Sequence, residues 1–254
     1  MVLNLYLAQA GVASRRKAAE LIKDGQVSVN QVTITDPSYR VQETDKIKVG
    51  NQFVKMEKKI YILLNKPIGY LSTTADEQER ATVLHLIPNG IQQRIYPIGR
   101  LDIDTSGLLV ITNDGQLAQR LAHPRYEVKK EYVAILNKQL TPEHFEEILK
   151  GVYLKDGKVR VDGIVHMKAK PLNWVKVTLH NGRFRIVKRL FAALGYNVKS
   201  LDRVCFAGLT KKGLPQGKWR FLNAAEIKDL HTLSKPKKIQ TKVIAKRQIK
   251  NNLH

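Results

Sequence analysis

The sequence predicts an α+β fold in three parts: a small N-terminal domain at residues 1–58, a larger domain at 59–233 and a basic tail at 234–254. Helical spacing of apolar residues near the start gives way to short alternating patterns that are typical of strands. Hydrophobic residues make up 43% of the 254 residues, which is enough to bury one or two cores. From Ser234 onward no acidic residue occurs, and this change in composition separates the tail from the rest.

The first 58 residues contain two helix patterns followed by strand patterns. The segment before Gly11 carries an apolar stripe and predicts an amphipathic helix rather than a signal peptide, because no positive charge precedes it. Ser14 is a suitable N-cap for a second helix over Arg15–Lys23, which stops at Gly25. Short antiparallel strands are expected on either side of the pair at 30–31.

Three cations, Arg15, Arg16 and Lys17, open this second helix. For the helix alone their placement is unfavourable, because the N-terminus of a helix already carries a partial positive charge. A phosphate bound there would relieve the repulsion and accept hydrogen bonds from the free N–H groups. The sequence therefore predicts a contact with a nucleic-acid backbone, and the alternative is that all three side chains are simply solvated.

The larger domain is expected to consist of many antiparallel strands with a few helices. It begins after the link at 57–59 with a strand marked by Ile60, Ile62 and Leu64, which the turn at 66–69 ends. Further strands are expected at 108–112, 131–136, 164–169 and 174–180, and helices at 116–122, 142–150 and 186–194. Thr141 can cap the second of these helices, and glycines at positions 151 and 195 end the second and the third.

The charge indicates a polyanionic partner. The chain carries 44 basic and 22 acidic residues, a formal net charge of +22. The small domain has nine basic and six acidic residues, the larger one 28 and 16, and the tail seven and none. Such a tail is expected to be a flexible arm that binds phosphates, although a tail that only aids solubility has the same composition. No stretch approaches the ~18 consecutive apolar residues of a membrane helix, so no membrane partner is expected.

Cysteine and histidine usage argues against disulfides and structural metal. Cys205 is the only cysteine, so no internal disulfide can form, and the seven histidines show no spacing of metal ligands. A reducing, cytoplasmic compartment and no bound metal are therefore expected. Neither a GxGxxG loop nor a Walker loop occurs, which removes dinucleotide and nucleoside triphosphate enzymes from the leading candidates.

The most informative segment is PIGRLDIDTSGLLVITNDG at residues 97–115, a polar turn in front of an apolar strand pattern. It places two carboxylates, Asp102 and Asp104, close to Arg100. A neighbouring cation favours the ionised form of a carboxylate, which suits nucleophilic or electrostatic chemistry better than proton donation. Asp, Thr, Ser and Gly are also ordinary turn residues, so chemistry alone favours a purely structural turn over a catalytic one.

Several segments in the same order make the chain similar to a known family. LAQAGVASRRKAAELIKDGQVSVN resembles the S4 RNA-binding domain, with Gln31 where that domain commonly has glycine. GRLDIDTSGLL with TNDG resembles the catalytic motif of RsuA/RluB-type pseudouridine synthases, ribosomal RNA enzymes with an N-terminal S4 domain. LLNKPIGYLST, KKEYVA, HNGRFRIVKRLFAALGY and GLPQGKWRFL match further segments of that family. The resemblance covers residues 3 to about 230 and implies an S4 domain followed by a pseudouridine synthase catalytic domain.

The resemblance implies three catalytic residues. Asp102 matches the catalytic carboxylate, and Lys188 matches a cation that would keep Asp102 charged. Tyr132 matches the aromatic residue that stacks on the target base. Ile186 departs from the family, which usually has Gln or Glu before V-[KR]-R, and this loses a polar contact near the site.

The resemblance also implies a set of RNA contacts. Arg100 would hold phosphate or fill the place of the extruded nucleotide. Leu209 would pack under the target base, with an ordinary core leucine as the alternative. The remaining expected contacts are Arg15, Arg16, Lys17, Arg183 and Arg189.

The implied reaction is isomerisation of uridine to pseudouridine, which needs no redox change and no donated group, so no cofactor is expected. The expected partner is ribosomal RNA or a pre-ribosomal particle, bound by a monomer. Large-subunit (23S) RNA is preferred because of the basic tail, whereas FAALG and Lys188 lean toward small-subunit (16S) RNA. A third hypothesis is a non-catalytic, S4-type ribosome-assembly factor, against which the intact Asp102, Tyr132 and Lys188 argue.

Overall fold

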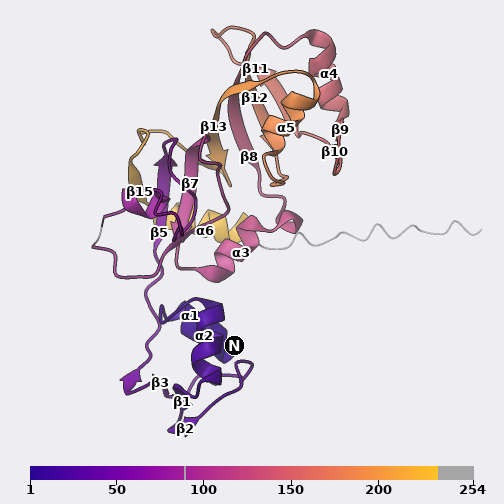
Figure 1. The fold of residues 1–254 in the computed structure, drawn as a ribbon. Coiled ribbons are helices and arrows are strands. Elements are labelled where there is room, and N and C mark those ends of the chain that lie inside the picture. The colour runs from indigo at the N-terminus through magenta and orange to yellow at the C-terminus, as the bar shows by residue number, and fades with distance from the viewer. Residues whose placement is uncertain (89, 234–254) are drawn as a thin grey trace, which may run out of the picture.

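The computed structural model describes residues 1–88 and 90–233, so the predicted basic tail at 234–254 lies outside the described residues. Figure 1 shows an N-terminal module, in indigo, joined by a single linker segment to a larger body. In that body β-strands from distant parts of the sequence lie side by side. The predicted α+β class, with a mixed and mainly antiparallel sheet, is confirmed.

In the N-terminal module two helices pack on a small antiparallel sheet with strand order β2-β1-β3-β4. Its elements are α1 (Leu3–Gln9), α2 (Arg15–Lys23), β1 (Val27–Val29), β2 (Val32–Thr33), β3 (Ile47–Val49) and β4 (Gln52–Phe53). Ser14 caps α2 as predicted, because its side chain accepts a hydrogen bond of 3.2 Å from the Lys17 amide. Asn30 and Gln31 turn the β1–β2 hairpin with φ angles of 52° and 70°, so Gln31 adopts the left-handed geometry that glycine takes without strain.

One nine-stranded sheet organises the larger body, with a main order of β11-β12-β8-β13-β7-β5-β15. Its strands are β5 (Tyr61–Lys66), β6 (Tyr96–Pro97), β7 (Ser106–Thr112), β8 (Lys130–Leu136), β11 (Gly163–His166), β12 (Trp174–Leu179), β13 (Val198–Phe206), β14 (Leu209–Thr210) and β15 (Trp219–Phe221). Neighbouring strands are antiparallel except β13 and β7, which are parallel.

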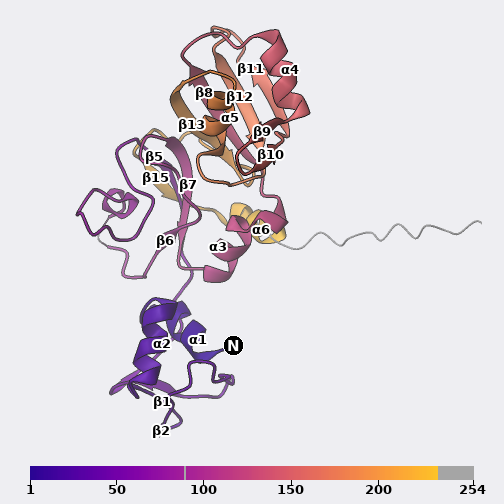
Figure 2. The same ribbon diagram turned by 45° about the vertical axis from the view of Figure 1, so that its right-hand side comes forward.

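Two lobes with separate cores share this sheet. The distal lobe, residues 130–205, packs β8, β11, β12 and β13 against α4 (Pro142–Lys150), α5 (Ile186–Ala193) and the hairpin of β9 (Val152–Leu154) and β10 (Gly157–Val159). The proximal lobe, residues 60–129 and 206–233, holds β5, β6, β7, β14 and β15 with α3 (Gly115–Ala122), α6 (Ala224–Leu233) and the 3-10 turns at Val83–Leu86 and Pro124–Tyr126. Figure 2 shows α3 and α6 together on the side of the proximal lobe that faces the N-terminal module.

The lobes meet where β13 runs beside β7, and this seam requires a glycine. Only two residue pairs join the strands, Asp202 with Ser106 and Arg203 with Gly107. Gly107 has φ +112°, and a Cβ added to it would lie 2.3 Å from the backbone oxygen of Arg203. The close approach of the two backbones therefore excludes any side chain at position 107.

The predicted helices and strands recur with small shifts, while several elements were missed. The helix predicted at 142–150 has the expected bounds, with Thr141 as N-cap and Gly151 after its last residue. The strand predicted at 164–169 ends at His166, because residues 167–170 turn: the Lys170 amide donates to the Met167 carbonyl at 3.2 Å. The sequence did not predict β3, β4, β6, β9, β10, β13, β14, β15 or α6.

Candidate active site

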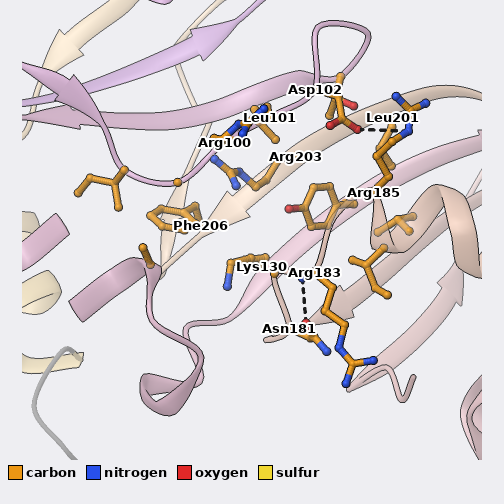
Figure 3. Close-up of a pocket in the computed structure, with 18 of the residues that line it drawn as sticks. Arg100, Leu101, Asp102, Lys130, Asn181, Arg183, Arg185, Leu201, Arg203 and Phe206 are labelled. Carbon is orange, nitrogen blue, oxygen red and sulfur yellow. Dashed lines mark hydrogen bonds and ion pairs between the residues drawn. The ribbon is translucent and has the colours of Figure 1, made fainter. Parts of the chain in front are cut away.

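A cavity of about 130 Å³ lies at the seam between the lobes (Figure 3). Its walls come from the loop before β7, from β8 and β13, and from the segment between β12 and α5. Four of the predicted site residues line it: Arg100, Asp102, Tyr132 and Arg183. Ile186, where the family usually has a polar residue, lines it as an apolar group that is 6% exposed.

The loop that carries Asp102 is held through every second carbonyl by the last residue of β5 and the segment that follows it. Lys66 Nζ donates to the Thr105 carbonyl at 2.8 Å, and the Gly69 amide donates to the Ile103 carbonyl at 2.8 Å. Ser72 accepts from the Leu101 amide at 3.1 Å and donates to its carbonyl at 2.9 Å. Because each of these donors comes from residues 66–72, the predicted turn at 66–69 positions the predicted carboxylate.

Two cations from the distal lobe reach the two carboxylates of this loop. Lys188 Nζ lies 2.5 Å from Asp104 Oδ1 and 4.0 Å from Asp102 Oδ2. Arg185 Nη2 lies 3.5 Å from Asp104 Oδ2, while its Nε lies 4.0 Å from Asp102 Oδ2. The expected ion pair of Lys188 with Asp102 is therefore present but longer than its ion pair with Asp104, which is the main partner of the lysine.

This arrangement gives the two carboxylates different surroundings. Partial burial opposes ionisation of Asp104, but the hydrogen bond and charge of Lys188, with the charge of Arg185, outweigh it and lower the pKa of Asp104. Asp102 is the more enclosed of the two, with 27% of its side chain exposed against 52% for Asp104. Asp104 holds the cations in place, and the carboxylate of Asp102 faces the cavity in their field (Figure 3).

Tyr132 connects the two lobes. It lies on β8, opposite Val177 of β12 and Arg203 of β13. Its ring packs against the core of the distal lobe and against part of the core of the proximal lobe. A flat aromatic side chain at this position offers a stacking surface inside the same cavity as Asp102.

Three cations near the cavity, two of them buried and one partly buried, were not singled out from the sequence. Arg203 is 2% exposed, donates from Nε to the Leu108 carbonyl at 2.7 Å and lies over the Phe206 ring. Burial, together with the positive charges of Arg203 and Lys188, lowers the pKa of Lys66 to about 8. The negative charges of the two carboxylates act in the opposite direction but are outweighed. Burial and Arg203 likewise lower the pKa of Lys130 to about 8. Lys66 lies in the NKP motif and Lys130 in the KKEYVA motif, so the family resemblance could have identified both lysines. Arg203 lies outside every motif quoted above, so the resemblance gave no indication of it.

The other predicted RNA contacts lie elsewhere. Leu209 is 5% exposed in the core of the proximal lobe and does not line the cavity, so the structure favours the alternative of a core leucine. Arg189 is bound to Asp156, with Nη1 3.1 Å from Oδ2. Arg16 and Lys17 are exposed on α2. Arg15 lines a second cavity, of about 390 Å³, together with Arg94 of the proximal lobe.

Residues 1–88 and 90–233 contain neither a metal-binding cluster nor a membrane-spanning helix. No cluster of three or more His, Cys, Asp or Glu side chains in this part could bind a metal ion. No helix there has the length and apolar character needed to cross a membrane.

Comparisons with known proteins agree on one family. Residues 60–193 match the family described as RNA pseudouridylate synthase, and residues 3–47 match the S4 domain. The "Ribosomal large subunit pseudouridine synthase B" of Bacillus subtilis (strain 168) is 42% identical over 235 residues, which cover 91% of this chain and 96% of that protein. The Yersinia pestis protein of the same name is 36% identical over 229 residues, 87% of this chain and 72% of its own length. A crystal structure of a pseudouridylate synthase superimposes with a TM-score of 0.64 at 26% identity, covering 91% of this chain and 99% of the other.

Proposed function

Because the chain belongs to the RNA pseudouridylate synthase family, and is therefore an isomerase that makes pseudouridine in RNA, we propose that its target is a uridine of large-subunit ribosomal RNA. Two relatives that carry this target in their names support the proposal, one of them along nearly the whole chain. The net charge of +22 supports binding to a large structured RNA.

In the proposed mechanism Asp102 is the catalytic carboxylate. The observation that carries this assignment is that Asp102 faces a cavity shared with Tyr132, in the field of Lys188 and Arg185. The target uridine must leave its stack to enter such a cavity, and Tyr132 would then stack on the flipped base. Arg100 and Arg183, which line the same cavity, would bind the phosphates on either side or occupy the vacated place in the RNA.

The proposed division of labour follows the architecture. Residues 1–58 would form the S4 domain that holds structured RNA through Arg15, Arg16 and Lys17, and residues 59–233 the catalytic domain. The separate core of the module supports a boundary at this place. A monomer is the proposed state of the enzyme, and the reducing cytoplasm is the proposed location.

The decisive experiment is to incubate the protein with unmodified large- and small-subunit ribosomal RNA and to map pseudouridines by carbodiimide-dependent primer stops. We expect a single new stop in the large-subunit RNA. Asp102→Asn should abolish it while RNA binding stays within about twofold, because the amide keeps the shape of the side chain and loses its charge. Modification of the small-subunit RNA alone would overturn the proposed target, and activity that survives Asp102→Asn would overturn the proposed carboxylate.

A further inference from the structure

Phe184 lies in the segment between β12 and α5 that forms one wall of the cavity. Its neighbours Arg183 and Arg185 line the cavity (Figure 3), whereas Phe184 is 71% exposed and does not line it. The Phe184 side chain is therefore exposed to solvent beside the cavity wall, between two residues in the sequence that line the cavity.

Phe184 is the one phenylalanine of the described residues whose side chain neither belongs to a buried core nor has an aromatic ring or a cation beside it. All six phenylalanines lie there, and Phe191 and Phe206 belong to buried cores. Three others have a ring or cation beside them: Phe145 with His166, Phe221 with Trp219, and Phe53 with Lys48. Within the described residues Phe184 has no ring or cation contact of this kind, and 71% of the residue is exposed.

The backbone that carries the ring is fixed from outside the segment. Arg189 Nη1 donates to the Phe184 carbonyl at 3.3 Å and to Asp156 Oδ2 at 3.1 Å. Arg183 Nη1 donates to the Asp156 carbonyl at 3.0 Å. The hairpin of β9 and β10 thus holds the segment through Asp156, and a ring on a fixed backbone loses little conformational entropy when a ligand stacks on it.

We propose that Phe184 is a stacking platform for the unpaired base beside the target uridine, an inference that rests on the proposed function. When a uridine leaves its stack to reach Asp102, the adjacent base loses a stacking partner, and an exposed aromatic ring at the cavity wall replaces it. Arg183 and Arg185 supply positive charge for the phosphates around that nucleotide. Phe184 thereby binds a nucleotide that the reaction itself does not change.

The test uses RNA fragments that contain the uridine mapped in the experiment above. Phe184→Leu keeps an apolar side chain but removes the ring, and we expect it to raise KM by about 5- to 150-fold with kcat nearly unchanged. Phe184→Tyr should restore KM to within about twofold of the wild type, since it restores the ring. The matched control is Phe221→Leu, which alters an exposed phenylalanine outside the cavity lining and should leave KM unchanged.

A substrate lacking one base separates stacking from a general effect on the fold. Fragments with an abasic residue on either side of the target should reveal one position at which the wild type loses affinity. With that fragment, Phe184→Leu should cost nothing further, because ring and base act as a pair. Equal KM values for Phe184→Leu and Phe221→Leu would overturn the proposal. It would also be overturned if the affinity lost through Phe184→Leu and the affinity lost through the abasic residue were additive. If the wild type modifies no ribosomal RNA, the proposed function itself fails, and this is seen before any variant is compared.

Discussion

Buried basic side chains set the electrostatics of the cavity. Arg203 and Lys66 are 2% and 0% exposed, and Lys130 lines the cavity, so water screens their charges poorly. Each also makes a structural hydrogen bond to a backbone carbonyl: Leu108 for Arg203, Thr105 for Lys66, and His180 for Lys130. The same residues thus hold the walls of the cavity and make its interior attractive to a polyanion.

We expect kcat/KM to fall as the pH rises through about 8, the pKa to which Lys66 and Lys130 are lowered. Loss of the ammonium proton removes charge near Asp102 and weakens the support of its loop. Unfolding does not explain such a loss: in the unfolded chain these lysines keep their protons up to their ordinary pKa of 10.5, so their contribution to stability rises between pH 8 and 10.5. Single-turnover rates and urea unfolding, both measured on either side of pH 8, check the expectation. A rate that does not change across this range would contradict it.

At the scale of elements, β13 does most to place the site. It is the longest strand among the described residues, it lies between β8 and β7, and it carries Arg203 into the cavity wall. Its two-residue pairing with β7 brings the Asp102 loop of the proximal lobe to the distal lobe that holds Tyr132 and Lys188.

Gly107→Ala should disrupt this seam. A Cβ at position 107 meets the Arg203 backbone, which cannot move aside like a flexible side chain, and φ +112° adds strain. We expect a loss of about 3 kcal/mol or more in the free energy of unfolding, measured by urea titration. Gly163→Ala is the control, because that strand glycine has nothing within 4 Å of an added Cβ. Similar unfolding curves for the two variants would contradict the importance assigned to the seam.

The sequence was most informative where patterns are local. Ser14, Thr141 and the apolar periodicities give correct helices, because caps and amphipathic faces are properties of neighbouring residues. Strand β13 was missed because its inward-facing residues are not all apolar. Arg203 is buried in it, so the strand lacks the alternation of apolar and polar residues by which a strand is recognised in a sequence. Asp102 was found through its motif, whereas the hold of Asp104 on Lys188 depends on two lobes meeting, which no local pattern contains.

At the scale of the whole molecule, Asn113 fastens the N-terminal module to the proximal lobe. Its Oδ1 accepts from the Ile60 amide at 2.8 Å, and its Nδ2 donates to the Lys58 carbonyl at 3.1 Å and to Glu57 at 3.2 Å. Asn113 therefore fixes the start of the proximal lobe at Ile60 and makes two hydrogen bonds to the link itself, which is not a loose tether.

Asn113→Ala should loosen this link without unfolding either part. We expect hydrogen exchange of the Ile60 amide to become about 5- to 10-fold faster, the effect of losing a hydrogen bond worth about 1 kcal/mol. Asn137→Ala is a matched control, because Asn137 accepts a backbone hydrogen bond at 2.8 Å in the distal lobe. Unchanged exchange at Ile60 in Asn113→Ala would show that the link is held by other contacts.

Deletion of 234–254 tests the part of the charge that lies outside the described residues. The deletion removes seven basic and no acidic residues, so fewer counterions are released on RNA binding. We expect weaker binding at low salt and a flatter dependence of the logarithm of the binding constant on salt, measured by filter binding. A tail with its seven basic residues replaced by Gln should behave like the deletion, and an unchanged slope would assign the tail to solubility alone.

The order of the lobes along the chain governs when the cavity can exist. The core of the distal lobe is drawn from residues 134–201, one continuous stretch, whereas the core of the proximal lobe combines residues 61–128 with 206–230. The distal lobe is thus nested inside the proximal one, and its contacts close shorter chain loops, which cost less entropy. During synthesis from the N-terminus, the proximal core is complete only once α6 has emerged. The seam, and with it the cavity proposed as the active site, is therefore among the last features of the molecule to assemble.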